Sequence, residues 1–319
     1  MNNRNSGRVP HLDDLQRLLD AMAHATEVPD AAGFIQRCDA IERLELHLAE
    51  LSNAQPADQT GRASALHDQA VALCHRLQQM NAVVVQALRQ DIETGRRLRG
   101  DLVLELQRYN EEPLENETDS NLHYDALDVL VAGLLGTDRL LDGDSVETLP
   151  EMIPYQPTPA RIILEIVKQT NLSPHDVFVD VGSGLGVVPT LVSLLSGAAA
   201  IGIEVQPSYC RHADECVRRL NLSNVRFICQ DARQADFSVG TVFYMYTPFK
   251  GAMLQQVLDR LHAEGLRRRI RLCTYGPIVS EAVQQPWLPA FERSQLIKGP
   301  IAVFHSKPHD HAEDDTGDA

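Results

Sequence analysis

The chain has 319 residues, of which 44% are hydrophobic and 5% aromatic, and its formal net charge is −15. This length suffices for two domains that each bury a core. No apolar run reaches the roughly 18 residues of a membrane span, and the first residues lack the apolar core of a signal peptide. Six scattered cysteines without a CxxC pair predict reduced thiols in a cytoplasmic protein, and no zinc site.

The negative charge is concentrated in the first half of the chain. Residues 1–150 carry 13 Lys and Arg against 26 Asp and Glu, whereas residues 151–307 carry 16 against 13. An acidic half disfavours a nucleic-acid partner and favours a basic protein partner. The densest basic cluster, RRRIR at residues 267–271, is interpreted as a solvated helix end with cations near its C-terminus.

The residue pattern of the first half of the chain predicts helices and no strands. Segments with apolar residues at helical spacing are 11–25, 30–54, 62–108 and 123–136. Asp30 is a plausible N-cap and Gly136 a C-cap, and 62–108 is either one long helix or two end to end. Residues 110–121 form an acidic loop. We therefore expect a disordered segment 1–10 and an all-α domain over residues 11–145, which serves as a helical cap or a dimer surface.

Beyond residue 150, short apolar runs alternate with helical patterns. Expected helices are 160–172, 187–197, 207–222 and 251–265, and expected strands are 176–181, 198–205, 225–232, 241–248, 269–276, 291–297 and 301–306. Such alternation predicts a parallel sheet with helices on both faces. We expect an α/β domain over residues 150–307, with a seven-stranded Rossmann-like sheet that ends in an antiparallel hairpin. The acidic tail, residues 308–319, is expected to be disordered.

The segment VFVDVGSGLG ends a predicted strand with an acid and a glycine-rich loop. Asp180 precedes Gly182, Gly184 and Gly186. Ligands of open α/β sheets bind beyond the carboxyl ends of the strands. A dinucleotide requires G-x-G-x-x-G, and the Asp180 carboxylate would repel its pyrophosphate. The same carboxylate suits an ammonium group, so the loop favours S-adenosylmethionine, which combines an ammonium with ribose and adenine and has no phosphate.

Two further acids end the next two predicted strands. Glu204 lies 22 residues after Gly182, where a carboxylate can accept hydrogen bonds from both ribose hydroxyls. Asp231 can accept from the adenine amino group, and the backbone N–H of Ala232 can meet a ring nitrogen. A single acid at a strand end is usually a turn or helix cap. Three acids around one glycine loop predict a binding site for S-adenosylmethionine.

These motifs, DVGSGLG, GIEV and QDA, resemble those of class I S-adenosylmethionine-dependent methyltransferases. The upstream YQPTPARIILEI is similar to the opening of two lysine methyltransferase groups: the nucleosomal histone enzymes of the disruptor-of-telomeric-silencing type, and the small mitochondrial and prokaryotic enzymes with a Tyr-x-Pro-Thr-Pro opening. The resemblance covers roughly residues 150–306. It implies that Tyr155 and Thr158 close over the methionine end of the cofactor. It further implies a first cofactor loop made of Phe178, Asp180, Gly182, Ser183, Gly184 and Gly186.

One departure concerns the methyl acceptor. The fourth strand of the domain ends in FYMYTPFKG, where the histone enzymes carry an Asn pair and other N-methyltransferases an Asp-Pro-Pro-Tyr-like motif. Met245 and Tyr246 stand at those positions, so the amide acceptor is absent there. Tyr246 and Phe249 are candidates for the walls of an aromatic substrate channel, and the alternative is that both only pack in the core.

Three functional hypotheses remain open from the sequence. The first is a methyltransferase that acts on a protein lysine. The second is a methyltransferase that acts on RNA or a small molecule, against which the acidic half argues in the case of RNA. The third is a cofactor-binding scaffold without catalysis, although a scaffold would need neither the glycine loop nor the three acids. The sequence does not specify the oligomeric state.

Overall fold

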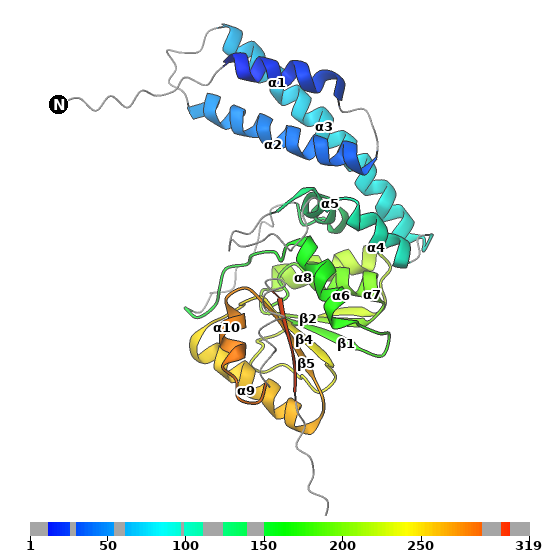
Figure 1. Cartoon of the computed structure of the whole chain (residues 1–319), viewed down its shortest axis with the longest axis vertical. Coiled ribbons are helices and arrows are strands. Elements are labelled where there is room, and N and C mark those ends of the chain that lie inside the picture. The colour runs from blue at the N-terminus through cyan, green and yellow to red at the C-terminus, as the bar shows by residue number, and fades with distance from the viewer. Residues whose placement is uncertain are drawn as a thin grey trace, which may run out of the picture.

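The computed structural model describes residues 12–25, 30–53, 61–96, 99–110, 124–138, 150–288 and 301–306. Figure 1 shows a helical arm at one end and a sheet covered by helices at the other. The predicted disordered ends, the acidic loop and the strand at 291–297 lie outside the described residues, apart from Asn110.

The helical half consists of α1 (Leu12–Ala25), α2 (Ala31–Asn53), α3 (Gly61–Glu93), α4 (Arg99–Gln107) and α5 (Ala126–Leu135). The predicted segment 62–108 is two helices, which separate after Gly95 adopts a left-handed conformation (φ 63°). The Asp30 side chain accepts a hydrogen bond from the Gly33 N–H (2.8 Å), as an N-cap does. Gly136 is the left-handed C-cap of α5.

The second half forms a six-stranded sheet among the described residues, with the order β3-β2-β1-β4-β5-β6. The strands are β1 (Val177–Val181), β2 (Ala199–Glu204), β3 (Val225–Cys229), β4 (Val242–Met245), β5 (Arg271–Tyr275) and β6 (Ile301–His305). All neighbours are parallel except β5 and β6, which are antiparallel. The expected mixed α/β sheet with an antiparallel end is confirmed. Its order reverses between β1 and β4, which is where a parallel sheet opens a crevice for ligands.

Helices cover both faces of this sheet. α6 (Ala160–Thr170), α7 (Val187–Ser196) and α8 (Pro207–Arg219) lie on one face, and α9 (Gly251–Arg267) and α10 (Ile278–Val283) on the other (Figure 1). Each face has its own hydrophobic core. The α10 helix was missing from the sequence-based prediction, because six residues are too few to display a helical period.

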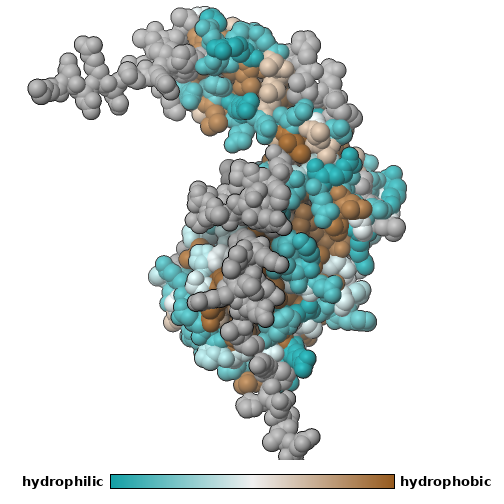
Figure 2. Space-filling model, in the orientation of Figure 1, coloured by the Kyte–Doolittle hydropathy of each residue, from teal (hydrophilic) through white to brown (hydrophobic). Residues whose placement is uncertain are grey.

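The helical half shares one of these cores. Phe34 of α2, Leu88 of α3 and Leu130 of α5 belong to the same buried cluster as Ile162 of α6 and Val188 of α7. A separate cluster, built around Leu44 and Leu77, holds α1, α2 and the first part of α3 together. Figure 2 shows the result as two lobes joined along one side. The two helices α2 and α3 thus run from one hydrophobic core into the other.

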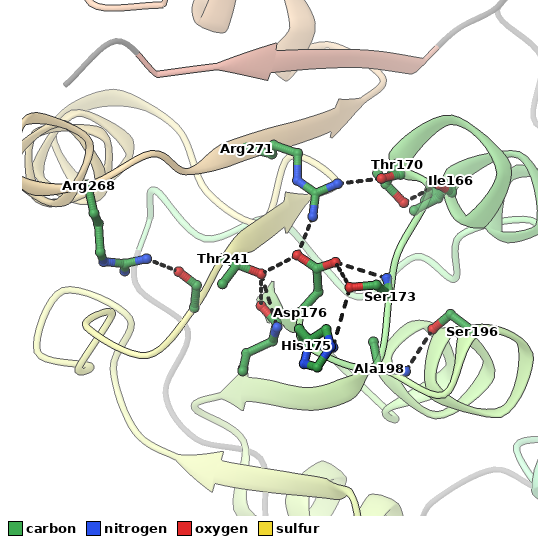
Figure 3. A network of polar contacts seen from close by, with 12 residues as sticks. Ile166, Thr170, Ser173, His175, Asp176, Ser196, Ala198, Thr241, Arg268 and Arg271 are labelled. Atoms are coloured by element: carbon green, nitrogen blue, oxygen red, sulfur yellow. Dashed lines mark hydrogen bonds and ion pairs between the residues drawn. The ribbon is translucent and has the colours of Figure 1, made fainter.

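A polar network fastens the amino ends of the strands, away from the glycine loop (Figure 3). The Asp176 carboxylate accepts hydrogen bonds from the Ser173 N–H and hydroxyl (2.9 Å each) and from the Thr241 hydroxyl (2.8 Å), and it pairs with Arg271. Burial alone would raise the pKa of Asp176, but these hydrogen bonds lower it to about 2.

The interpretation of RRRIR as a solvated helix end is therefore wrong for two of its arginines. Arg271 also donates to the Thr170 carbonyl, and Arg268 donates to the Phe237 carbonyl at 2.7 Å. Both side chains are largely withdrawn from solvent. They donate hydrogen bonds to backbone carbonyls near the amino ends of the strands. Arg267, in contrast, lies exposed in the last turn of α9.

Candidate active site

A cavity of about 960 Å³ lies at the carboxyl ends of β1, β2, β3 and β4. Its volume matches that of pockets for drug-sized or cofactor-sized ligands. Ten of the predicted site residues line it: Tyr155, Thr158, Asp180, Gly182, Ser183, Glu204, Asp231, Ala232, Tyr246 and Phe249.

Three predicted residues lie outside the cavity lining. Phe178 is fully buried on β1, where its ring stacks on Tyr244 at 6.1 Å. Gly186 begins α7 and lies against the Phe227 ring. Gly184 is covered by Tyr155, so that a Cβ built on it would lie 2.2 Å from that ring. These residues shape the loop and the strand behind it.

Asp180 is the buried acid of the site. Only 3% of the residue is exposed, and no hydrogen bond reaches its carboxylate from the part of the chain that the structure describes. Burial, together with the nearby Glu204, raises its pKa well above the ordinary value. The hydroxyl of Ser183 is also buried without a hydrogen-bond partner. An unpaired acid and an unpaired hydroxyl in one cavity fit a ligand that brings both a cation and an acceptor, as an amino-acid headgroup does.

Glu204 ends β2 and is held by the backbone. One carboxylate oxygen accepts from the Gly184 N–H (2.8 Å), and the other accepts from the N–H groups of Val205 and Gln206 (2.8 Å each). A carboxylate offers about four acceptor positions. Glu204 therefore keeps room for about one more strong hydrogen bond, and its contact with both ribose hydroxyls stays a prediction.

Asp231 is already paired within the protein. Its two oxygens accept from the Arg233 guanidinium at 2.6–3.1 Å and from the Arg233 N–H at 2.8 Å. These bonds lower the pKa of Asp231, so the group is ionised at neutral pH. The predicted adenine acceptor thus lies in the cavity wall with an arginine partner that the sequence motif did not reveal.

The segment before α6 covers the glycine loop. The Tyr155 ring lies over Gly184 and is 5.5 Å from the ring of Tyr209 on α8. The Thr158 hydroxyl shares a buried hydrogen bond with the Tyr244 hydroxyl at the end of β4 (2.9 Å). The segment is therefore in contact with three of the elements that line the cavity.

The loop after β4 forms the remaining wall. The ring centroids of Tyr246 and Tyr275 are 4.7 Å apart. The pKa of the Tyr246 hydroxyl is raised, mainly by burial and to a smaller extent by Tyr275. Phe249 is 3% exposed and pairs through its backbone with Met152. Tyr246 thus presents a neutral hydroxyl at physiological pH, on an aromatic wall.

Other contributors were not anticipated from the sequence. Glu151 caps α9 from a distance of 101 and 102 residues along the chain, because its carboxylate accepts from the N–H groups of Ala252 (2.9 Å) and Met253 (3.0 Å). Tyr209 and Glu281 line the cavity. Only the tertiary structure brings these side chains to the site. Within the described residues, no three His, Cys, Asp or Glu side chains converge as metal ligands, and no helix there combines the length and apolarity of a membrane span.

Residues 154–243 match the family model of the histone methylation protein DOT1. This match confirms, for these residues, the predicted resemblance to S-adenosylmethionine-dependent methyltransferases. The match runs from the segment before α6 into β4, so it contains the glycine loop and all three acids, and it leaves the helical half outside. Compared with curated proteins, the sequence gives no significant match.

Several solved structures are similar in part. An RNA methyltransferase from Salinibacter ruber in complex with S-adenosyl-L-homocysteine is 21% identical, over 50% of this chain and 98% of that one, at a TM-score of 0.38. A precorrin-6y C5,15-methyltransferase from Geobacter metallireducens is 19% identical, over 45% and 76% of the two chains, at a TM-score of 0.35. A geranyl diphosphate C-methyltransferase from Streptomyces coelicolor is 15% identical, over 39% and 50%, at a TM-score of 0.32.

Proposed function

We propose that the methyltransferase domain transfers a methyl group from S-adenosylmethionine to the side-chain nitrogen of a lysine in a protein. The observation that carries the proposal is the match of residues 154–243 to a histone methylation family. The aromatic wall of Tyr246 and Phe249 at the end of β4 supports it, because an extended lysine stem is apolar up to its nitrogen.

The cofactor supplies an activated methyl group on a positively charged sulfur. The residues of this chain would hold and shield it: Asp180 would pair with its ammonium and Glu204 with a ribose hydroxyl, while Tyr155 covers the glycine loop. Alignment and exclusion of water can supply about 7–11 kcal/mol of rate enhancement. The protein therefore needs no covalent step of its own.

The lysine must arrive without its proton. An unperturbed pKa of about 10.4 makes this cost roughly 4.6 kcal/mol at pH 7. Burial in an apolar channel, next to a positive charge, lowers that pKa. The Tyr246 hydroxyl is the candidate acceptor for a hydrogen of the amine, in place of the amide that the histone enzymes carry.

The test uses tritiated S-adenosylmethionine with purified histones and with the same histones after their lysines have been acetylated chemically. Transfer to the native histones that is lost after acetylation supports lysine as the acceptor. Equal transfer to both would refute it. Total RNA and a small-molecule extract are parallel substrates, and transfer to either of these alone would favour the second hypothesis from the sequence.

We further propose a basic protein as the partner and the cytoplasm as the compartment. The acidic first half, with 26 Asp and Glu against 13 Lys and Arg, complements a basic surface. Because the helical half shares a core with the sheet, a deletion would damage the fold. The better test neutralises three exposed acids of α2 (Asp39, Glu42 and Glu50 to their amides) and measures the salt dependence of KM for the histone substrate. An unchanged KM would contradict the partner proposal.

A further inference from the structure

Helix α5 of the helical half holds the segment that covers the cofactor loop. The Tyr124 hydroxyl, just before α5, donates to the Pro157 carbonyl (2.8 Å). The Asp128 carboxylate on α5 accepts from the Ala160 N–H (2.7 Å). These two contacts lie on either side of Thr158, whose hydroxyl bonds to Tyr244.

Three residues of this segment cannot donate a backbone hydrogen bond. Pro154, Pro157 and Pro159 have no N–H to donate. Before them, the Ile153 N–H donates to the Pro248 carbonyl (3.0 Å), and Met152 forms a β-bridge with Phe249. The residue in the N-cap position of α6 is Pro159, which offers no side-chain acceptor.

Asp128 supplies that missing cap from another helix. A carboxylate at a helix N-terminus satisfies a free N–H and interacts favourably with the helix dipole. The second oxygen of Asp128 accepts from the Asp125 N–H (2.9 Å), in the capping box of α5 itself. One carboxylate therefore caps two helices, one in each half of the molecule.

We infer that Asp128 is a positioning residue for cofactor binding: it fixes the start of α6, and with it the segment that places Tyr155 over Gly184. The inference does not depend on the identity of the methyl acceptor. The helical half thereby contributes to cofactor binding, in addition to any contact that it makes with a partner protein.

The ionisation of Asp128 gives the inference a distinctive signature. Burial raises the pKa of Asp128 to about 6, although the hydrogen bonds from the Ala160 and Asp125 N–H groups lower it. Of the nearby charges, Asp125 raises this pKa and Arg161 lowers it. Tyr124 also faces Asp128, as a neutral hydroxyl. Below pH 6 the carboxyl becomes neutral and is a weaker acceptor, so its hold on the Ala160 N–H weakens.

The experiment compares cofactor binding by wild type, Asp128→Asn and Tyr124→Phe at pH 5–8, by calorimetric titration with S-adenosylhomocysteine. Asp138→Asn, an exposed change shortly after α5, is the matched control. We expect Asp128→Asn to weaken binding about tenfold at pH 7.5, because the amide presents an N–H where one of two donors needs an acceptor.

The pH profile separates positioning from a general loss of stability. Wild-type affinity should fall towards that of Asp128→Asn as the pH drops through 6, whereas the difference for Tyr124→Phe should persist at every pH and Asp138→Asn should follow wild type. Equal affinities of wild type and Asp128→Asn at pH 7.5 would overturn the inference, as would a difference that does not change with pH. If Asp128→Asn does not fold, then unaltered binding by Tyr124→Phe would overturn it.

Discussion

Replacement of Glu204 by Gln tests the geometry of the cofactor site most directly. In the structure, one oxygen of Glu204 accepts from Val205 and Gln206 and the other from Gly184. A glutamine can serve the first pair through its carbonyl, but its NH2 group then faces the Gly184 N–H. An unsatisfied donor costs about 1–3 kcal/mol, and this loss falls on the folded protein with or without ligand.

Cofactor binding should suffer a separate loss. The remaining acceptor position of Glu204 would no longer carry a charge-assisted hydrogen bond to a ribose hydroxyl, which is worth about 1.5–3 kcal/mol. That range corresponds to a dissociation constant about 10- to 150-fold higher. Urea unfolding without ligand measures the first effect, and calorimetric titration with S-adenosylmethionine measures the second.

The two effects should be distinguishable against a control. Asp259→Asn changes an exposed acid of α9 that accepts a hydrogen bond from the exposed Gln255, and it should leave both measurements as in wild type. A Glu204→Gln protein that binds the cofactor as tightly as wild type would refute the ribose assignment, even if it were less stable.

Three other changes have equally definite outcomes. Gly184→Ala combines a left-handed φ of 53° with a Cβ 2.2 Å from the Tyr155 ring, so it should weaken cofactor binding at least about tenfold in calorimetry, whereas Gly100→Ala, which meets nothing within 4 Å, should not. Asp176→Asn should cost about 2 kcal/mol or more in urea unfolding at pH 7. Because the folded pKa of Asp176 is depressed from 3.8 to about 2, its stabilisation is complete above pH 3.8 and is lost as the pH falls to 2; a wild type and variant with parallel pH profiles would contradict this. Tyr246→Phe should lower kcat about 10- to 100-fold with the cofactor dissociation constant unchanged, and an unaltered kcat would exclude its hydroxyl from the reaction.

The parts of the molecule that local patterns determine could be predicted from the sequence. The alternation of apolar runs identifies all six described strands, and of the two alternatives for residues 62–108 the structure shows two helices, with Gly95 between them. Gly182, Ser183 and Glu204 are assigned from spacing, and all three line the cavity. Each of these assignments depends only on neighbours in the chain, where period and turn chemistry operate.

The rest depends on contacts between distant residues. The sequence predicts that Arg268 and Arg271 are surface charges, because it does not show that carbonyls of other elements lie next to them in the fold. Arg233 is two residues from Asp231, yet no spacing rule says that it folds back on that acid. The capping of α6 by Asp128 requires two helices to pack first. Side chains that satisfy the backbone of another element leave no periodic signal.

The length of α3 sets a distance between the two lobes. Its 33 residues correspond to about 50 Å of helix, and its two ends are buried in different cores. The same is true of α2, which runs in the opposite direction, so two antiparallel helices connect the lobes and oppose rotation between them. A protein bound to the helical arm would therefore lie at a fixed distance from Tyr246. This distance would determine which residues of the bound protein can reach the methyl group.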